Sequence, residues 1–293
     1  MSTKAGFIAL IGKPNAGKST LLNAILGQKL AITTPKAQTT RHRILGMAIH
    51  KNCQLVFSDT PGIIDPKYKL QEYMMDSVSG SLKDADVLVV LVDPADDELP
   101  PELAPEIEKR DTPKIVVINK VDGYPQDRIQ ERVEYWREKL NPKAVIPVSA
   151  LHNFNIEALK DQLVDLCPEH PYFYPEDQLT DKSERFFVAE IIREKILMLY
   201  RNEIPYSTEV DIEEFKDEET IVKIKAMIYV ERNSQKRILI GKGGLALKKT
   251  GTEARKDIEK FLGKKVFLST FIKVRENWRK NDIQLKRFGY KDQ

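Results

Sequence analysis

A glycine-rich octapeptide near the start of the chain limits its fold more than any other feature. Residues 12–19 read GKPNAGKS and match the pattern GxxxxGK[ST]. An apolar run over 7–11 precedes them, and the apolar spacing over 19–26 is typical of a helix. Between a strand and a helix, consecutive backbone N–H groups and the helix dipole surround an anion. The octapeptide therefore predicts a phosphate-binding loop in an α/β domain, rather than a chance match in a glycine-containing turn.

The residues of this loop have separate tasks. Gly12 and Gly17 let the backbone turn tightly and approach a ligand closely. Lys18 places a cation at the β- and γ-phosphates, and the hydroxyl of Ser19 is a hard oxygen ligand for Mg²⁺. We expect a nucleotide with Mg²⁺ to contact the whole stretch: Gly12, Lys13, Pro14, Asn15, Ala16, Gly17, Lys18, Ser19 and Thr20.

Apolar runs and helical stretches alternate from residue 7 to residue 166. The runs cover 7–11, 55–57, 87–92, 115–118 and 145–148, and the helical stretches cover 19–26, 70–82, 127–140 and 156–166. Buried strands separated by helices predict a doubly wound, mainly parallel sheet. Residues 43–50 fit an additional antiparallel strand at its edge. A ligand of such a sheet binds at the carboxyl ends of the strands.

Three further motifs follow predicted strands and select the nucleotide. They are Asp59-Thr60-Pro61-Gly62, Asn119-Lys120-Val121-Asp122 and Ser149-Ala150-Leu151. A carboxylate at Asp59 can hold Mg²⁺ through water, and the N–H of Gly62 can meet the γ-phosphate. A carboxylate at Asp122 can accept hydrogen bonds from N1–H and the exocyclic amine of guanine, whereas adenine would leave it unpaired. The motifs predict GTP rather than ATP. A P-loop kinase for a small molecule is a rival interpretation, but such a kinase should lack a guanine-reading motif like Asn119–Asp122.

This set of motifs resembles the translation-factor-related class of P-loop GTPases. The resemblance assigns Lys36–Arg41 to switch I and implies that Thr40 is the second protein ligand of Mg²⁺, beside Ser19 and Asp59. Thr39 is the alternative ligand. A further alternative is that Thr39 and Thr40 bind no metal and simply favour an extended backbone. Lys18, Thr40, Gly62 and Asn15 are the expected catalytic residues.

Ile63 stands where Ras-like proteins carry a water-orienting glutamine, so we expect it beside the nucleotide without a polar role. Asn15 is what potassium-stimulated members of the class carry, which makes K⁺ a candidate cofactor. Arg41 stays open as an arginine finger. Slow intrinsic hydrolysis is the expectation.

The sequence pattern changes after residue 166. Residues 167–175 contain three prolines, which favours an extended linker. We expect a GTP-binding domain over 1–168, a linker over 169–184 and a second domain over 185–293. The second domain has helical spacing at 185–200, 235–240 and 246–262, and strand-like alternation at 207–215, 220–230 and 266–274. This order predicts a small α+β domain.

A charge split accompanies this change. Residues 221–293 carry 20 Lys or Arg and 7 Asp or Glu, whereas the preceding 220 residues carry 27 and 37. Within the basic part, Ile240-Gly241-Lys242-Gly243-Gly244 resembles the GxxG loop of a type II KH domain, which clamps the phosphates of a single strand. Lys248 and Lys249 follow it, and Ile238, Leu239 and Leu245 would line the groove. A glycine-rich turn between two helices is the alternative.

A GTPase with a proline-rich linker and a C-terminal type II KH domain resembles the Era-type ribosome-assembly GTPases. The resemblance implies binding to the 3′ end of small-subunit ribosomal RNA, contact with the small ribosomal subunit, and peripheral association with the inner face of the cell membrane in some members. A signalling GTPase whose basic tail binds anionic membrane is the alternative, although the basic residues do not form one amphipathic helix.

The remaining composition fits a cytosolic protein. The chain begins without the features of a secretory signal and has no apolar stretch long enough to span a bilayer. Cys53 and Cys167 have no metal-binding neighbours and read as buried apolar residues of a reducing compartment. We expect a monomer.

Overall fold

The computed structural model describes residues 3–290 and divides into two compact units. The first unit runs to Asp181 and leaves out Ile32–Thr39 and Tyr68–Leu70. Those two segments belong to the second unit, which otherwise begins at Lys182. The first two residues of the chain and the last three, which the expected domains include, lie outside the described residues.

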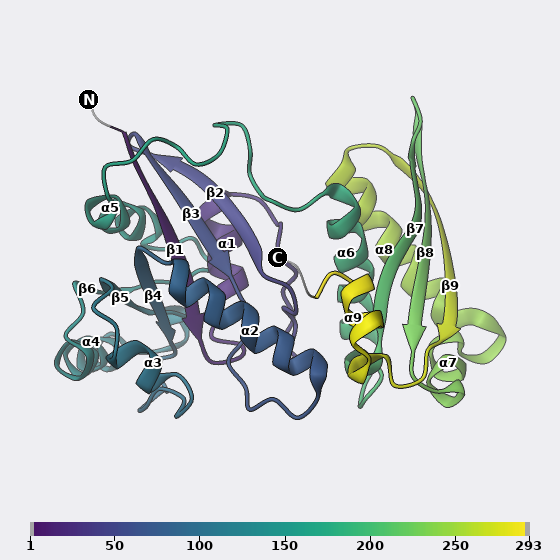
Figure 1. Cartoon of the computed structure of the whole chain (residues 1–293), viewed down its shortest axis with the longest axis horizontal. Coiled ribbons are helices and arrows are strands. Elements are labelled where there is room, and N and C mark those ends of the chain that lie inside the picture. The colour runs from purple at the N-terminus through teal and green to yellow at the C-terminus, as the bar shows by residue number, and fades with distance from the viewer. Residues whose placement is uncertain (1–2, 291–293) are drawn as a thin grey trace. The chain divides into compact units, whose positions relative to one another are not determined.

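The first unit is built on a six-stranded sheet with the order β2-β3-β1-β4-β5-β6 (Figure 1). Its strands are β1 (Lys4–Gly12), β2 (Ile44–His50), β3 (Cys53–Asp59), β4 (Val87–Val92), β5 (Lys114–Ile118) and β6 (Ala144–Pro147). All neighbours are parallel except β2, which is antiparallel to β3 at the edge. Runs such as Val87–Val92 are buried throughout because helices cover both faces of the sheet. The predicted doubly wound fold and its antiparallel edge strand are confirmed.

Helices on the two faces bury different parts of this sheet. They are α1 (Lys18–Leu26), α2 (Lys69–Asp84), α3 (Ala104–Glu108), α4 (Gln126–Leu140) and α5 (Ile156–Leu166). One face packs against apolar side chains of α2, α3 and α4, including Val78, Ile107 and Trp136. On the other face α1 and α5 pack together. Both cysteines are buried and free, and the described residues hold no cluster of metal-binding side chains.

The proline-containing segment after α5 is attached to this sheet. The buried side chain of Gln54 on β3 accepts hydrogen bonds from the N–H groups of Phe173 (2.8 Å) and Tyr174 (3.0 Å), and donates to the Tyr174 carbonyl (2.8 Å). Farther on, the N–H of Met47 on β2 donates to the carbonyl of Leu179 (2.9 Å). The extended chain up to Asp181 therefore belongs to the first unit.

The second unit places helices on one face of a three-stranded sheet, in the predicted order α-β-β-α-α-β. Its elements are α6 (Glu184–Leu199), β7 (Glu209–Asp217), β8 (Ile221–Val230), α7 (Asn233–Ile240), α8 (Leu245–Leu262) and β9 (Lys265–Val274). Strand β8 lies in the middle, antiparallel to β7 and parallel to β9. A short C-terminal helix, α9 (Asp282–Arg287), was not expected from the sequence.

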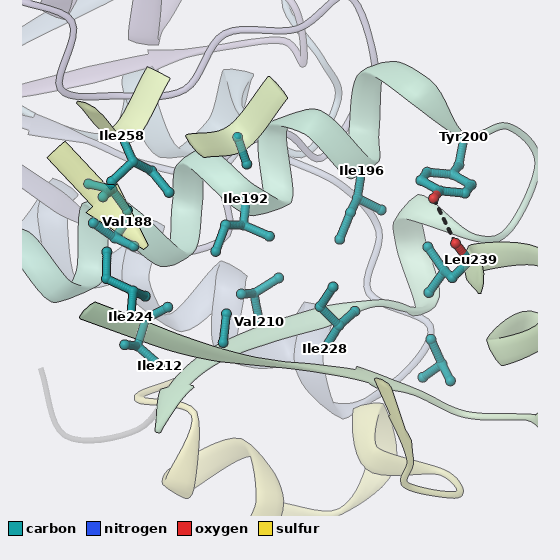
Figure 2. Close-up of a cluster of buried hydrophobic side chains, with 14 of the residues drawn as sticks. Val188, Ile192, Ile196, Tyr200, Val210, Ile212, Ile224, Ile228, Leu239 and Ile258 are labelled. Atoms are coloured by element: carbon teal, nitrogen blue, oxygen red, sulfur yellow. Dashed lines mark hydrogen bonds between the residues drawn. The ribbon is translucent and has the colours of Figure 1, made fainter. Parts of the chain in front are cut away.

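One apolar cluster fills the space between the helices and this sheet (Figure 2). Ile192 and Ile196 of α6 contribute to it together with Ile224 and Ile228 of β8. Leu239 is fully buried in the same cluster, so the expectation that it lines an RNA groove is wrong. Helical spacing turns Leu239 inward, because α7 presents its apolar side to the core.

Candidate functional site

The phosphate loop adopts a backbone that its glycines make accessible. Gly17 has φ 99°, and a Cβ there would lie 2.1 Å from Nδ2 of Asn119. Asn15 also has a positive φ, 64°, which asparagine tolerates better than most residues. Helix α1 begins at Lys18 without a side-chain cap, so the N–H groups of its first turn, up to Thr20, face the loop. The arrangement suits an anion at the helix N-terminus.

Lys18 is held inside this loop with little exposure. Its Nζ donates hydrogen bonds to the carbonyls of Gly12 (3.2 Å) and Lys13 (3.3 Å). Burial lowers the pKa of Lys18 to about 8, and the charge of Asp59 opposes that shift. A phosphate bound in the loop would give the ammonium group a counter-charge at close range.

Three side chains whose oxygen atoms could bind a metal lie together next to Lys18 in the structure. The Ser19 hydroxyl donates to Oδ2 of Asp59 (2.7 Å) and lies 2.9 Å from the Thr40 hydroxyl. Burial raises the pKa of Asp59 to about 6, although the Ser19 hydrogen bond and the charge of Lys18 lower it. The other carboxylate oxygen, Oδ1, is buried and has no hydrogen-bond partner among the described residues. Hydroxyl and carboxylate oxygens with an unused lone pair fit Mg²⁺.

The neighbouring threonine is engaged elsewhere. The hydroxyl of Thr39 donates to the carbonyl of Lys36 (2.6 Å) and lies 2.7 Å from the hydroxyl of Thr34. Only Thr40 of the two has its hydroxyl beside Ser19, so the geometry favours Thr40 as the ligand. Arg41 is buried.

The segment after β3 lies against the phosphate loop. Thr60 is buried and donates to the carbonyl of Leu10 (3.3 Å), and Pro61 is buried beside it. A Cβ on Gly62 would lie 2.8 Å from Cα of Pro14, so the backbone of Gly62 touches the loop. Ile63 is partly buried against the apolar cluster that includes Val78. Ile63 therefore has a packing role that accounts for its apolar side chain.

Asn119 ties three loops together at the opposite side of the site. Its Nδ2 donates to the carbonyl of Ala16 (2.9 Å), and its Oδ1 accepts from the N–H of Ala150 (3.1 Å). The N–H of Val121 donates to the carbonyl of Val148 (3.3 Å), which joins the ends of β5 and β6. These hydrogen bonds fix the phosphate loop relative to residues 119–122 and 149–151.

Asp122 projects from this framework as a charged acceptor. The Ser149 hydroxyl donates to Oδ1 of Asp122, and this hydrogen bond lowers the pKa of Asp122. The other oxygen lies 3.8 Å from Nε2 of His152, and about a third of the side chain is exposed. Leu151 is 72% exposed next to it. This part of the site thus exposes an ionised carboxylate and an apolar side chain.

Two aspartates after β4 support the site and were not expected from the sequence. Asp93 forms an ion pair with Lys120 (3.0 Å) and accepts from the Tyr124 hydroxyl (2.8 Å). Burial opposes ionisation of Asp93, but the N–H of Ala95 and these two partners keep its pKa below the ordinary value. Asp96 holds Nζ of Lys13 (2.7 Å). The sequence could have indicated Asp93, because it directly follows a buried apolar run, and Asp59 likewise stands at the carboxyl end of a buried strand.

In the second unit, the glycine-rich loop joins α7 to α8. Gly241, Gly243 and Gly244 have φ values of 70°, 57° and 78°. A Cβ on Gly241 would lie 2.6 Å from Cβ of Ala246, whereas Gly243 and Gly244 border open space. Helix α8 begins at Leu245 without a side-chain cap. A backbone with open glycines at a helix N-terminus can approach phosphates closely.

Exposed side chains surround this loop. Lys242, Lys248 and Lys249 are exposed, and Ile240 is partly buried. Ile238 and Leu245 expose 49% and 68% of their surface, so they remain available to a ligand, unlike Leu239. Positive charge next to exposed apolar side chains suits a single-stranded nucleic acid.

Comparisons with known proteins cover both units. A family model described as "50S ribosome-binding GTPase" matches residues 7–120, and a "KH domain" model matches residues 203–279. The GTPase Era of a Thermoanaerobacter species is 45% identical over 295 residues, covering 99% of this chain and 97% of the relative. GTPase Era of Clostridium botulinum is 44% identical over 293 residues, with 98% of each covered.

Solved structures are similar over the same length. Era in complex with MgGDPNP and nucleotides 1506–1542 of 16S ribosomal RNA gives a TM-score of 0.93 at 39% identity, covering 98% of this chain and 99% of the other. A variant of Aquifex aeolicus Era bound to GDP·AlF4⁻ gives 0.92 at 38% identity, with the same coverage. Because the likeness extends over both units, the chain belongs to the family of Era GTPases.

Proposed function

We propose that this GTPase binds GTP with Mg²⁺ at the carboxyl edge of its parallel sheet and binds the 3′ end of small-subunit ribosomal RNA through Gly241–Gly244. The solved Era complex with MgGDPNP and nucleotides 1506–1542 of 16S ribosomal RNA supports both halves. In this chain the RNA half rests on one observation, the open left-handed glycines at the start of α8.

The nucleotide residues divide into four groups by task. Lys18 and the N–H of Gly62 stabilise charge on the γ-phosphate as its bond to the β-phosphate breaks. Ser19, Thr40 and Asp59 would hold Mg²⁺, which would supply positive charge to the phosphate oxygens. Asp122 selects guanine because its carboxylate accepts two hydrogen bonds that adenine cannot donate. Asn119 keeps the phosphate and base loops in register.

Hydrolysis in this chain proceeds without a polar side chain at residue 63. Ile63 packs against the core and has no group that could orient water. Backbone groups and the charge of Lys18 therefore carry the electrostatic stabilisation, to which a bound Mg²⁺ would add positive charge. Asn15 in the phosphate loop is the residue that would admit K⁺ as a further cation. A slow intrinsic rate follows from this arrangement.

Crosslinking to cellular RNA tests the proposed partner. Wild-type protein loaded with GTP or with GDP would be crosslinked, and the bound RNA sequenced. We expect reads concentrated at the 3′ end of the small-subunit ribosomal RNA, with a difference between the two nucleotides. Reads spread over abundant RNAs in proportion to their amount would contradict a specific ribosomal site.

An anionic membrane surface is the other polyanion that a basic second unit could bind, and we propose only a peripheral association with it. We also propose that the protein is a monomer. In the described part of the chain, no helix is long and apolar enough to cross a membrane. Flotation with vesicles of zwitterionic lipid, with and without anionic lipid, separates the two partners. Vesicle binding that RNA does not compete away would place the basic surface on the membrane instead.

A further inference from the structure

The sheet of the second unit has one face that its helices leave open. Side chains at 265, 267, 269, 271 and 273 of β9 alternate to this face, opposite the core cluster. Phe267 and Phe271 on it expose 59% and 48% of their surface. The C-terminal segment covers only one end of the face, where Phe288 packs on the ring of Tyr229 (5.1 Å between centroids). Single exposed apolar residues are ordinary, but two rings on one face of an edge strand form a platform.

Lysines surround the two rings. The strand register places Lys223 beside Phe267 and Lys225 beside Ser269, between the rings. Nζ of Lys225 lies 5.5 Å from the ring centroid of Phe271. At the ends of β9, Lys265 and Lys273 are exposed, and each interacts electrostatically with a carboxylate, that of Glu259 and that of Glu213 respectively. The face therefore combines aromatic surface with positive charge.

The lysines of this face form only weak ion pairs with acidic residues. Glu213 pairs with Lys225 (3.0 Å) and Glu218 pairs with Lys223 (2.8 Å). All four side chains are substantially exposed, and exposed ion pairs contribute little to stability. A phosphate group could replace either carboxylate as the partner of a lysine at small cost.

Aromatic rings interleaved with lysines match the chemistry of a single-stranded nucleic acid. Bases stack on exposed rings whatever their sequence, and lysines follow the phosphates. Phe267 and Phe271 are four residues apart on a strand, so they lie about 13 Å from each other and can hold separate bases. A duplex keeps its bases stacked inside and offers none to the rings. Strand β9 also packs against α8, whose first residue follows the Gly241–Gly244 loop, so one RNA strand can pass from the loop around the edge of the sheet.

We propose that the open face of β8 and β9, with Phe267 and Phe271 at its centre, is a second binding surface for the single-stranded RNA that Gly241–Gly244 clamps. The proposal rests on the proposed RNA function of that loop. It extends the RNA footprint beyond the four nucleotides that a GxxG loop holds.

Single-stranded RNAs of two lengths distinguish binding at the Gly241–Gly244 loop from binding at the sheet face. A single strand of about four nucleotides fills only the loop, whereas one of about twelve can also reach the rings. In full-length protein, the double variant Phe267→Ala/Phe271→Ala should bind the long RNA about tenfold or more weakly and the short RNA as wild type does. The double variant Phe267→Tyr/Phe271→Tyr, which keeps the rings, should retain long-RNA binding. Ile283→Ala, which removes an exposed apolar side chain on α9, is the matched control and should change neither affinity.

Each outcome has a defined meaning. Wild-type protein that binds neither RNA would contradict the proposed RNA function itself. Wild-type protein that binds both RNAs, together with an alanine double variant of unchanged long-RNA affinity, would overturn only the sheet-face proposal. The same variants are tested for flotation with anionic vesicles. Loss of vesicle binding with intact RNA binding would assign the face to a membrane and also overturn the proposal.

Discussion

The carboxylate of Asp122 allows base recognition to be tested at a single residue. One oxygen accepts from Ser149, and the variant Asp122→Asn can keep that hydrogen bond through its amide oxygen. The amide NH₂ cannot accept from guanine but can donate to the 2-carbonyl of xanthine. We expect GTP affinity to fall about 100-fold or more and xanthosine triphosphate to become the better ligand. Competition binding with GTP, ATP and xanthosine triphosphate measures this, and tight ATP binding by the wild type would refute the assigned base site.

Lys18 and Lys13 offer a matched pair within one loop. Nζ of Lys18 is buried among loop carbonyls, whereas Nζ of Lys13 is bound by Asp96 at the rim. Lys18→Ala should lower the GTP hydrolysis rate by about 100- to 1,000-fold, because it removes a fixed charge from the transferring phosphate. Lys13→Ala leaves the backbone N–H in place and should cost only a few-fold. Similar losses in steady-state hydrolysis by the two variants would show that Lys18 has no special role.

At the scale of elements, the residues at the ends of strands allowed most of the nucleotide site to be predicted from the sequence. Asp59, Asn119 and Ser149 each follow a buried run, and parallel strands bring such positions to one edge. The choice between Thr39 and Thr40 depended on hydroxyl direction, which adjacent residues do not reveal. Helices α3 and α9 have five and six residues, too few for a periodic pattern. Apolar spacing also could not tell a core residue such as Leu239 from a groove residue.

The phosphate loop is the element on which potassium would act. If Asn15 holds a monovalent cation, GTP hydrolysis by the wild type should be severalfold faster in KCl than in NaCl at equal ionic strength. Asn15→Gly keeps the positive φ of this position and removes the side-chain oxygen, so it should abolish the difference. Ile63→Ala should preserve the difference, because Ile63 only packs. Equal wild-type rates in the two salts would remove potassium from the mechanism.

Tyr200 links three helices of the second unit. Its hydroxyl donates to the carbonyl of Leu239 inside the core (Figure 2). The same hydroxyl lies 2.9 Å from the hydroxyl of Thr250. Tyr200→Phe should lower the free energy of unfolding of this unit by about 1–2 kcal/mol, because the buried carbonyl loses its partner. Two proteins are compared by urea unfolding, one with Tyr200 and one with Tyr200→Phe, and both carry Trp136→Phe. Trp278 is then the one remaining tryptophan, so its fluorescence reports on this unit alone. GTP affinity is the control and should not change; an unchanged urea midpoint would mean that the hydrogen bond contributes nothing.

On the scale of the whole molecule, two sites of different chemistry share one chain. The first unit binds the nucleotide through polar groups at strand ends, and the second carries the excess of basic residues. The KH fold could be predicted from element order, but the open sheet face could not. That face depends on where the C-terminal segment packs, and the sequence gives no sign that Phe288 covers Tyr229 while Phe267 and Phe271 stay exposed.

The most direct test of the account is RNA affinity for Gly243→Asp beside Gly243→Asn. Asparagine and aspartate have the same shape and both tolerate the φ of 57° at this position, where a side chain meets open space. Only aspartate brings a negative charge to the phosphates, so it should bind single-stranded RNA at least about tenfold more weakly than the asparagine variant, with a difference that shrinks as salt increases. GTP affinity, measured on the same samples, should match wild type for both. Equal RNA affinity of the two variants across the salt series would contradict the claim that this loop clamps an RNA backbone.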